Sequence, residues 1–225
     1  MPINIAMDGP VGAGKSSIAD AVAARLSILH LDTGAMYRAC AIAVLRAGVD
    51  PADEAAATRV CEGITVGVQY ADGAQRTLLD GEDVTAGLRT PEVSAAASSV
   101  ARWPGVRRVM VRSQQRLAAE HDMLIDGRDI GIRVLPDAKV KIYLTADAEE
   151  RARRRWLQMK EQGQEADFDQ VLIDLRARDA QDMNRKTDPL QVAPGAVVVD
   201  STHLTQDETV DAIVALVEEA YGTGK

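Results

Sequence analysis

The segment Gly9-Pro10-Val11-Gly12-Ala13-Gly14-Lys15-Ser16 carries the strongest chemical signal in the chain. It fits the pattern G-x-x-x-x-G-K-S, in which glycines let the backbone curl so that successive N–H groups point at phosphate oxygens. The amine of Lys15 can reach the β and γ phosphates of a nucleoside triphosphate, and the hydroxyl of Ser16 can hold Mg²⁺. A glycine-rich turn between a strand and a helix would explain the glycines, but not the Lys-Ser pair at this offset. The segment therefore predicts a P-loop.

The stretch from Leu31 to Arg38 is a second candidate for chemistry. A short apolar strand ends at Asp32, and a helix that bears Tyr37 and Arg38 follows. Ligands of parallel sheets bind beyond the carboxyl ends of the strands, so Arg38 can face the same crevice as the P-loop. Alternatively, Asp32 or Thr33 caps the helix and Arg38 is a solvated charge. These residues alone favour neither interpretation.

The tetrapeptide Asp126-Gly127-Arg128-Asp129 follows another buried strand and should open onto the same edge. Arg128 has a planar guanidinium suited to bidentate phosphate contact, and Asp129 is an acceptor for a base or a sugar. The alternative is a surface turn with an Arg–Asp ion pair. Asp126 also completes an apolar run followed by Asp, a common pattern that can supply an outer-sphere carboxylate to Mg²⁺.

Two groups of charged residues on later helices can also contact phosphates. They are Arg151, Arg153, Arg154 and Arg155 at the start of one helix, and Arg178, Asp182 and Arg185 at i, i+4 and i+7 on one face of another. An arginine-bearing lid would exclude water from phosphoryl transfer. Because exposed charges contribute little to folding, we expect the lid arginines Arg154 and Arg155 to matter for chemistry more than for stability. Solvated helix faces and an ion pair between Arg178 and Asp182 are the alternative.

The composition limits the class of protein. A chain of 225 residues with 46% hydrophobic residues can form one α/β domain, and it lacks the run of about 18 apolar residues that a membrane span needs. Because Met1-Pro2 leads directly into the first strand, we expect a cytoplasmic protein. Cys40 and Cys61 lack metal-ligand spacing, so we expect both to be free thiols. The net charge of −8 disfavours nucleic acid as a partner. We expect no membrane partner and a monomer.

Apolar periodicity predicts strands that alternate with helices, which implies parallel pairing. The expected strands are 3–7, 28–31, 123–125, 140–144 and 196–199, with a hairpin at 64–70 and 75–80 around a turn at 71–74. The expected helices are 15–26, 37–47, 51–61, 92–102, 105–120, one after Asp147, about 168–183, and 209–221, with a polar break at 162–164. The hairpin indicates a small β-rich insertion between α/β units.

Seven segments, taken in order, resemble the bacterial cytidylate kinases, a family of P-loop nucleoside monophosphate kinases. They are 9–17, 31–38, 79–84, 89–93, 96–100, 126–131 and 178–185. The resemblance implies an α/β P-loop kinase fold, with a central parallel sheet and helices on both faces. It also implies one kinase domain over 1–225, with a core of about 1–35, 105–150 and 165–225, a nucleoside monophosphate-binding insertion of about 36–104 and a lid of about 151–165. The implied reaction transfers the γ-phosphate of ATP to CMP or dCMP.

The resemblance further implies a role for each matching residue. ATP would contact Gly9, Pro10, Val11, Gly12, Ala13, Gly14, Lys15, Ser16 and Ser17, with Ser16 toward Mg²⁺. The acceptor phosphate would contact Arg38, Arg128 and Arg185; the cytosine Ser98, Arg107 and Asp129; and the sugar region Tyr37, Arg178 and Asp182, with Thr33 also at the acceptor. Catalysis would involve Lys15, Arg128, Arg154, Arg155 and Arg185. Two departures stand out: Thr33 replaces Ser, and Ser16-Ser17 replaces Gly-Thr.

Such a reaction needs no covalent intermediate and no general base, because the acceptor phosphate is already anionic near neutral pH. One rival is a P-loop kinase for another small acceptor, such as UMP or dTMP. A second is a nucleotide-dependent switch or binding module. The guanine-reading pattern N-K-x-D is absent from the sequence, and residues 184–188 only approximate it with one residue too many.

Overall fold

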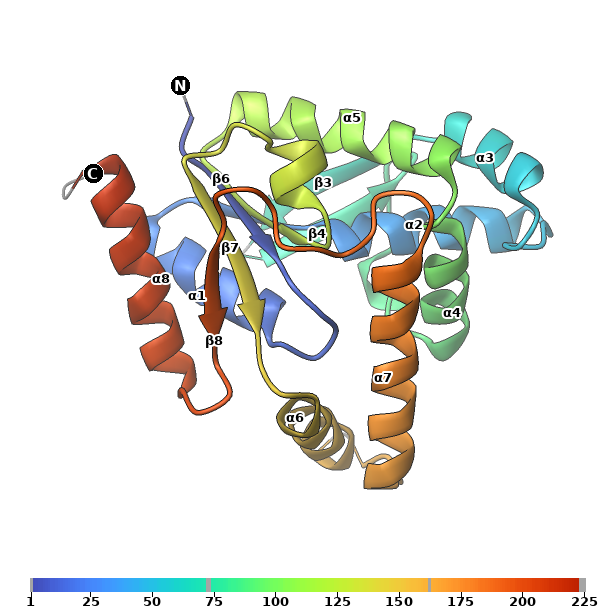
Figure 1. Ribbon diagram of the computed structural model, residues 1–225. Coiled ribbons are helices and arrows are strands. Elements are labelled where there is room, and N and C mark those ends of the chain that lie inside the picture. Colours follow the sequence, from blue (N-terminus) through green and yellow to red (C-terminus); the bar gives the residue numbers. More distant parts are fainter. Residues whose placement is uncertain (1, 72–73, 162, 223–225) are drawn as a thin grey trace. The chain divides into compact units, whose positions relative to one another are not determined.

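The computed structural model of the chain describes residues 2–71, 74–161 and 163–222 (Figure 1). Residues 72 and 73 of the expected turn and residue 162 of the expected polar break lie outside this part. The chain forms two compact units, one of Leu31–His121 and one that joins Ile3–His30 to Asp122–Lys225. We call them the small unit and the large unit.

The large unit is built on the parallel sheet that the apolar strands predict. Within the described residues the sheet has five strands in the order β2-β6-β1-β7-β8. The strands are β1 (Asn4–Asp8), β2 (Leu29–Asp32), β6 (Met123–Gly127), β7 (Val140–Thr145) and β8 (Val197–Asp200). In the register, Ile5 lies beside Leu124 of β6 and beside Val140 of β7. Central strands of a parallel sheet are covered on both faces, which is why their sequences read as continuous apolar runs.

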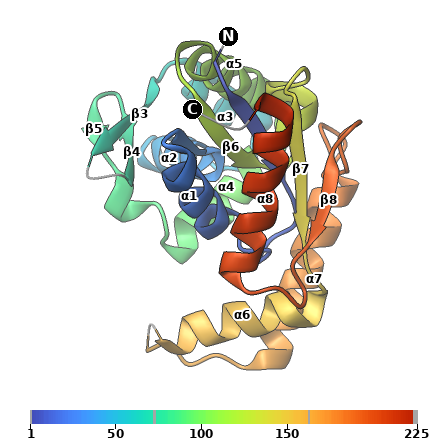
Figure 2. The ribbon, with the colours of Figure 1, turned by 90° about the vertical axis from the view of Figure 1, so that its left-hand side faces the viewer.

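Helices follow the strands of this sheet along the chain. They are α1 (Lys15–Leu26), α6 (Ala148–Glu161), α7 (Phe168–Asn184) and α8 (Gln206–Tyr221), with a π-helical turn, η2 (Ile130–Val134). Figures 1 and 2 show α1 and α8 side by side against the sheet, where Val22 and Ile213 join Ile5 and Leu144 in the buried core. A capping box formed by the Thr205 hydroxyl and Glu208 fixes the start of α8.

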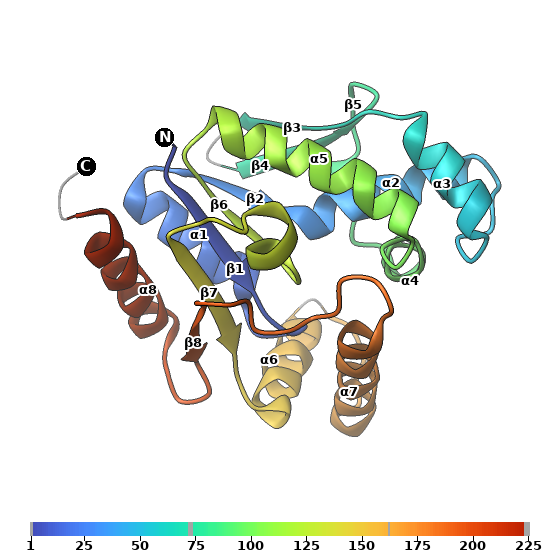
Figure 3. The same ribbon diagram turned by 45° about the horizontal axis from the view of Figure 1, so that its top comes forward.

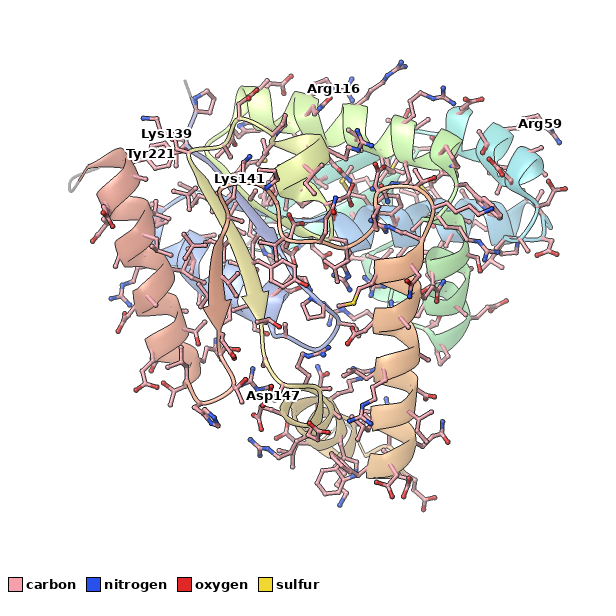
Figure 4. All side chains as sticks on the ribbon, viewed as in Figure 1. Arg59, Arg116, Lys139, Lys141, Asp147 and Tyr221 are labelled. Atoms are coloured by element: carbon pink, nitrogen blue, oxygen red, sulfur yellow. The ribbon has the colours of Figure 1, made fainter. Side chains whose placement is uncertain are left out.

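The end of α8 is fixed as well. Tyr221, labelled in Figure 4, donates its hydroxyl to the Asn4 carbonyl at 3.1 Å, and the Lys139 ammonium lies 5.1 Å from the Tyr221 ring centroid. Both partners lie in or beside the sheet. The C-terminal end of α8 is therefore held against the sheet.

The small unit consists of helices around an antiparallel sheet. Its elements are α2 (Thr33–Arg46), α3 (Glu54–Glu62), β3 (Val66–Ala71), β4 (Ala74–Leu79), β5 (Glu82–Asp83), the 3₁₀ turn η1 (Thr85–Gly87), α4 (Pro91–Val100) and α5 (Pro104–Glu120). Helix α2 packs against α4 and β4, and α3 packs against α5 (Figure 3). Both cysteines are buried free thiols, as expected, and the Cys40 thiol lies 3.4 Å from the Met110 sulfur.

The structure confirms the hairpin and the order of the elements, and it corrects some boundaries. Helix α2 begins at Thr33 rather than Tyr37, because the Asp32 carboxylate caps it by accepting from the Ala35 N–H at 3.0 Å. Helix α7 ends at Asn184, so Arg185 lies beyond the helical face predicted for it. No helix in the described ranges is long and apolar enough to cross a membrane.

Candidate active site

The loop between β1 and α1 has the glycine-dependent shape that its sequence predicts. Gly9 passes so close to β7 that a β-carbon there would lie 2.0 Å from the Leu144 carbonyl oxygen. Gly14 caps α1 in the left-handed conformation, with φ of 84°. The loop thus leads the backbone from a buried strand into the N-terminus of α1, which is where helix geometry favours bound phosphate.

Lys15 begins α1 and lies buried, with its ammonium donating to the Pro10 carbonyl at 2.8 Å. Burial and the neighbouring positive charge of Arg128 lower the pKa of Lys15 to about 7, against the pull of Asp126 and Asp8. Phosphate oxygens placed here would favour the charged amine. The position is suited to an anionic ligand.

Asp8, at the end of β1, was not among the residues singled out from the sequence. Its two carboxylate oxygens accept from the backbone N–H groups of Ile130 at 2.7 Å and Gly131 at 2.9 Å, which ties the start of η2 to the P-loop strand. Burial raises the pKa of Asp8 to about 6, although these two hydrogen bonds oppose the rise. Its position immediately before the P-loop, at a strand end, is a signal that could have identified it.

Ser16 belongs to a chain of polar contacts inside the large unit. Its hydroxyl lies 3.2 Å from Asp126 Oδ2, and Asp126 Oδ1 lies 3.1 Å from His30 Nε2. The other ring nitrogen of His30 lies 2.6 Å from Asp20 Oδ1. Burial by itself lowers the pKa of His30, but the hydrogen bonds to Asp126 and Asp20 outweigh it and raise this pKa to about 10. His30 belongs to none of the motifs recognised in the sequence.

The oxygens of Ser16 and Asp126 fit a magnesium ion. Mg²⁺ prefers hard oxygen ligands, keeps several waters and binds proteins through one or two side chains plus substrate phosphates. Within the described residues, no group of three His, Cys, Asp or Glu side chains is arranged to hold a metal. The ion would therefore take most of its ligands from phosphates and water. Ser17, the other hydroxyl considered, is exposed.

The arginines after β6 and α7 are held by carboxylates of the same unit. Arg128 Nε lies 2.7 Å from Asp182 Oδ2, and Arg185 Nη2 lies 3.1 Å from Asp129 Oδ1. Asp129 is buried, with 5% of its surface exposed. The structure thus brings together four of the residues predicted to contact the acceptor. Asp129 pairs with Arg185. The alternative interpretation of residues 126–129 had expected an Arg–Asp ion pair within the turn itself.

Helix α6 carries the arginine cluster, and its members differ in their contacts. Arg151 is buried and donates to the Val11 carbonyl of the P-loop and to the Ala146 carbonyl, each at 2.8 Å. Arg154 donates to the Ser201 carbonyl at 2.6 Å. The start of the helix, marked by Asp147 in Figure 4, is thus tied to the core of the large unit.

Further along α6, Arg155 is exposed and donates to Gln158 within the same helix at 2.8 Å. Its guanidinium is therefore the more accessible of the two predicted catalytic arginines of the lid. A phosphate contact by Arg154 or Arg155 stays a prediction.

Within the small unit, the predicted base- and sugar-binding residues come from three helices. Arg107 of α5 is buried, its guanidinium lies 5.6 Å from the ring centroid of Tyr37 in α2, and it donates to the Ala101 carbonyl at 3.1 Å. The Ser98 hydroxyl donates to the Ser94 carbonyl at 3.1 Å within α4. Tyr37 and Arg107 are thus brought together.

Thr33 and Arg38 lie at the start of α2, which Asp32 caps. The cap alternative for Asp32 is therefore confirmed. Arg38 lies over the first turn, since a β-carbon on Gly34 would be 3.1 Å from its Nη1 atom. The lack of a side chain at Gly34 leaves room for that guanidinium.

The fold and the loop first define a class. A parallel α/β sheet whose first strand leads through a G-x-x-x-x-G-K-S loop into a helix is the architecture of the P-loop nucleotide-binding proteins. A solved structure of an uncharacterized protein from Eubacterium ventriosum shares the fold, with a TM-score of 0.55 at 13% identity over 97% of this chain and 99% of that one.

Comparison with known sequences identifies the family. The cytidylate kinase family model matches residues 5–219. The chain is 46% identical over 214 residues to the cytidylate kinase of Caldicellulosiruptor bescii, covering 95% of each. It is 47% identical over 211 residues to that of Symbiobacterium thermophilum, covering 93% of each. The chain belongs to the cytidylate kinase family, as its resemblance predicted.

Proposed function

We propose that this protein transfers the γ-phosphoryl group of ATP to CMP or dCMP, giving ADP and CDP or dCDP. Membership of the cytidylate kinase family supports this activity over a kinase for UMP or dTMP and over a nucleotide-dependent switch. The observation that carries it in the structure is the P-loop, in which Lys15 is buried at the N-terminus of α1. The enzyme is a phosphotransferase with a phosphate group as acceptor.

The transfer is an in-line displacement without a covalent intermediate. An oxygen of the acceptor phosphate forms the new P–O bond, the bond between the γ-phosphorus and the β–γ bridging oxygen breaks, and ADP leaves with that oxygen. The acceptor oxygen is already ionised near neutral pH, so no side chain has to remove a proton. Catalysis is then alignment plus stabilisation of spreading negative charge. The protein supplies Lys15 and backbone N–H groups for this purpose.

Mg²⁺, when bound with ATP, neutralises charge on the β and γ phosphates. Ser16 and Asp126 are the side chains that would hold it. Their 3.2 Å contact already places a hydroxyl beside a carboxylate whose pKa is lowered. Burial raises the pKa of Asp126, but the hydrogen bond from His30 and the positive charges of His30, Lys15 and Arg128 together outweigh burial. Asp126 therefore stays ionised and accepts the hydrogen bond of the Ser16 hydroxyl, which leaves the hydroxyl lone pairs for the ion.

The acceptor nucleotide is bound by residues of several of the sequence motifs. Its phosphate is bound by Arg38, Arg128 and Arg185, and its cytosine by Ser98, Arg107 and Asp129. The side chains near its sugar are Tyr37, Arg178 and Asp182, and Thr33 also contacts the acceptor. Arg128 and Arg185 pair with carboxylates in this structure. A phosphate of higher charge can replace those partners and use the same planar donors. The lid arginines Arg154 and Arg155 stabilise the transferring group.

The experiment that tests this function is an ADP-release assay with purified protein, Mg·ATP and each nucleoside monophosphate in turn. We expect the highest kcat/KM for CMP or dCMP and at least about tenfold less for UMP, because an unpaired buried group costs about 1–3 kcal/mol. A higher kcat/KM for UMP or dTMP would overturn the assignment of the acceptor. ADP release that is independent of any monophosphate would instead indicate a nucleotide-hydrolysing switch.

A further inference from the structure

His30 is a buried charged residue that the proposed reaction does not use. It lies in β2 with 9% of its surface exposed, and both of its ring nitrogens contact carboxylates. Carboxylates that are ionised only accept hydrogen bonds, so both nitrogens must donate and the ring is an imidazolium. A positive charge is thus built into the large unit directly behind Asp126.

The contact with His30 restrains the Asp126 carboxylate. Rotation about the last side-chain bond of Asp is loosely defined on its own, so its oxygens need partners to fix them. Here Oδ1 accepts from His30, and Oδ2, on the other side of the same group, lies 3.2 Å from the Ser16 hydroxyl. Only 4% of the Asp126 surface is exposed, so water contributes little to this restraint. The histidine therefore determines which oxygen faces Ser16.

Asp20 orients the ring from the opposite side. Ser16 and Asp20 lie at i and i+4 on α1, so one helix face bears both ends of the contact chain. The contact of Asp20 Oδ1 with His30 Nδ1 is short, at 2.6 Å, and 68% of the Asp20 side chain is exposed. Two strands and one helix of a single unit thus supply all four residues. The chain of contacts ends at the hydroxyl that the proposed function gives to Mg²⁺.

We propose that His30 is a positioning residue for the magnesium ion of the bound nucleotide, acting through the Asp126 carboxylate and the Ser16 hydroxyl. The inference rests on the proposed function, since it requires a metal–nucleotide complex at the P-loop. His30 touches neither substrate nor metal. Replacement of residues that orient metal ligands weakens metal affinity by about 10–100-fold. The expected signature is therefore a loss of metal affinity without a loss of affinity for the metal-free nucleotide.

Two substitutions separate the contacts of His30. In His30→Gln the side-chain amide nitrogen falls near the position of Nε2 and still donates to Asp126. In His30→Asn it falls near Nδ1 and donates only toward Asp20. His203→Asn, at an exposed histidine of the same unit, is the matched control. Mn²⁺ is used in place of Mg²⁺, and the protein is saturated with the β,γ-imido analogue of ATP. The readout is the Kd of Mn²⁺ for this complex, which is measured from the electron paramagnetic resonance signal of free Mn²⁺. The affinity for the analogue without metal is measured alongside.

We expect His30→Asn to weaken Mn²⁺ binding by about tenfold or more, and His30→Gln and His203→Asn to stay within about 1.5-fold of wild type. The affinity for the metal-free analogue should be unchanged in all three. An unchanged Mn²⁺ affinity in His30→Asn overturns the proposal, as does a parallel loss of metal-free affinity, which would indicate a structural role. The analogue in solution also binds Mn²⁺. If the analogue bound to the wild-type protein binds Mn²⁺ no more tightly than the analogue in solution, the role that the proposed function gives to magnesium fails.

Should His30→Asn not fold, Asp20→Asn serves as the second variant, because Asp20 is largely exposed. It weakens the orientation of the ring and leaves the Asp126 contact in place. We expect a loss of about threefold in Mn²⁺ affinity with an unchanged melting temperature. Full Mn²⁺ affinity in this variant would count against the positioning role.

Discussion

At the scale of single residues, the phosphate site is a balance of buried charges. Lys15, Asp8 and Asp126 are each almost fully buried, and each has a pKa set by the opposition of burial and neighbours. Burial lowers the pKa of the amine and raises that of Asp8 for the same reason, since both charged forms lose hydration. An anionic ligand adds further negative charge next to Lys15 and so favours its charged form.

The first prediction concerns Lys15. Lys15→Ala should fold and bind nucleotide weakly, and its kcat should fall by about 10²–10³-fold, because a preorganised charge at the transferring phosphoryl group is lost. Steady-state kinetics together with a melting curve measure both effects. Near-normal turnover in a folded Lys15→Ala protein would refute the P-loop assignment.

The second prediction concerns base choice and Asp129. Cytosine presents an amine donor at N4 where uracil presents an acceptor, so a buried carboxylate favours the first and opposes the second. We expect Asp129→Ala to lower kcat/KM for CMP and to narrow the CMP-to-UMP ratio by about tenfold. The structure offers a competing role, because Asp129 lies 3.1 Å from Arg185. If Asp129 only orients Arg185, kcat/KM falls equally for CMP and UMP in Asp129→Ala, and the CMP-to-UMP ratio of kcat/KM stays the same.

At this scale the sequence was informative wherever the site requires a particular local backbone conformation. Gly9 and Gly14 predict the P-loop, because only glycine fits the close approach to β7 at position 9 and the left-handed φ at position 14. Asp8 and His30 are different. Their partners lie on other strands and helices of the sheet, and which side chains meet there depends on strand order and register, which periodicity does not reveal.

At the scale of elements, the helix α6, which the sequence predicts to be part of a lid, is held to the rest of its unit by arginines near its start. Near the start of the helix, Arg151 donates to a backbone carbonyl of the P-loop, and Arg154 donates to a backbone carbonyl of the segment after β8. Arg155 donates to Gln158 within the same helix. The expectation that the lid arginines matter little for stability is therefore revised for Arg154. Loss of its guanidinium removes partners from Ser201 and Glu150.

The third prediction uses Arg154 and Arg155 as a matched pair. Arg154→Ala should lower the free energy of unfolding by about 1–3 kcal/mol, because charge-assisted hydrogen bonds to the carbonyl and the hydroxyl of Ser201 are lost. Arg155→Ala should leave the melting temperature almost unchanged and lower kcat, because its side chain is exposed and available to the phosphates. Equal melting temperatures for the two variants would contradict this distinction.

Most elements followed from apolar periodicity and turn residues, and α1 was predicted with the observed limits, Lys15–Leu26. The errors lie at ends. Helix α2 starts early because the Asp32 cap acts before the apolar pattern begins, and α7 ends before Arg185, which takes an extended backbone. The short strand β5 and the π-helical turn η2 were not predicted. The first is only Glu82–Asp83, and the second depends on the distant carboxylate of Asp8.

At the scale of the whole molecule, stability should depend on pH through Asp8. Its pKa is about 6 in the folded protein, against 3.8 as the ordinary value. Folding therefore favours the protonated form, so the contribution of Asp8 to stability is greatest below about pH 4 and is lost as the pH rises through about 6.

The fourth prediction compares the wild type with Asp8→Asn, which cannot titrate at this position. Between about pH 4 and pH 7, the unfolding free energy of wild type relative to the variant should fall by up to about 3 kcal/mol. Urea denaturation at a series of pH values measures this difference. A difference that is constant with pH, or that grows as the pH rises, would contradict the raised pKa.

The central claim, that the γ-phosphoryl group passes from ATP to CMP, is tested most directly by identifying the products. Purified protein is incubated with Mg·ATP labelled with ³²P in the γ position and with CMP, and the nucleotides are separated by anion-exchange chromatography. The account predicts that the label appears in the β position of CDP, in amounts equal to the ADP formed, with little inorganic phosphate. Label released as inorganic phosphate without CDP would contradict the claim.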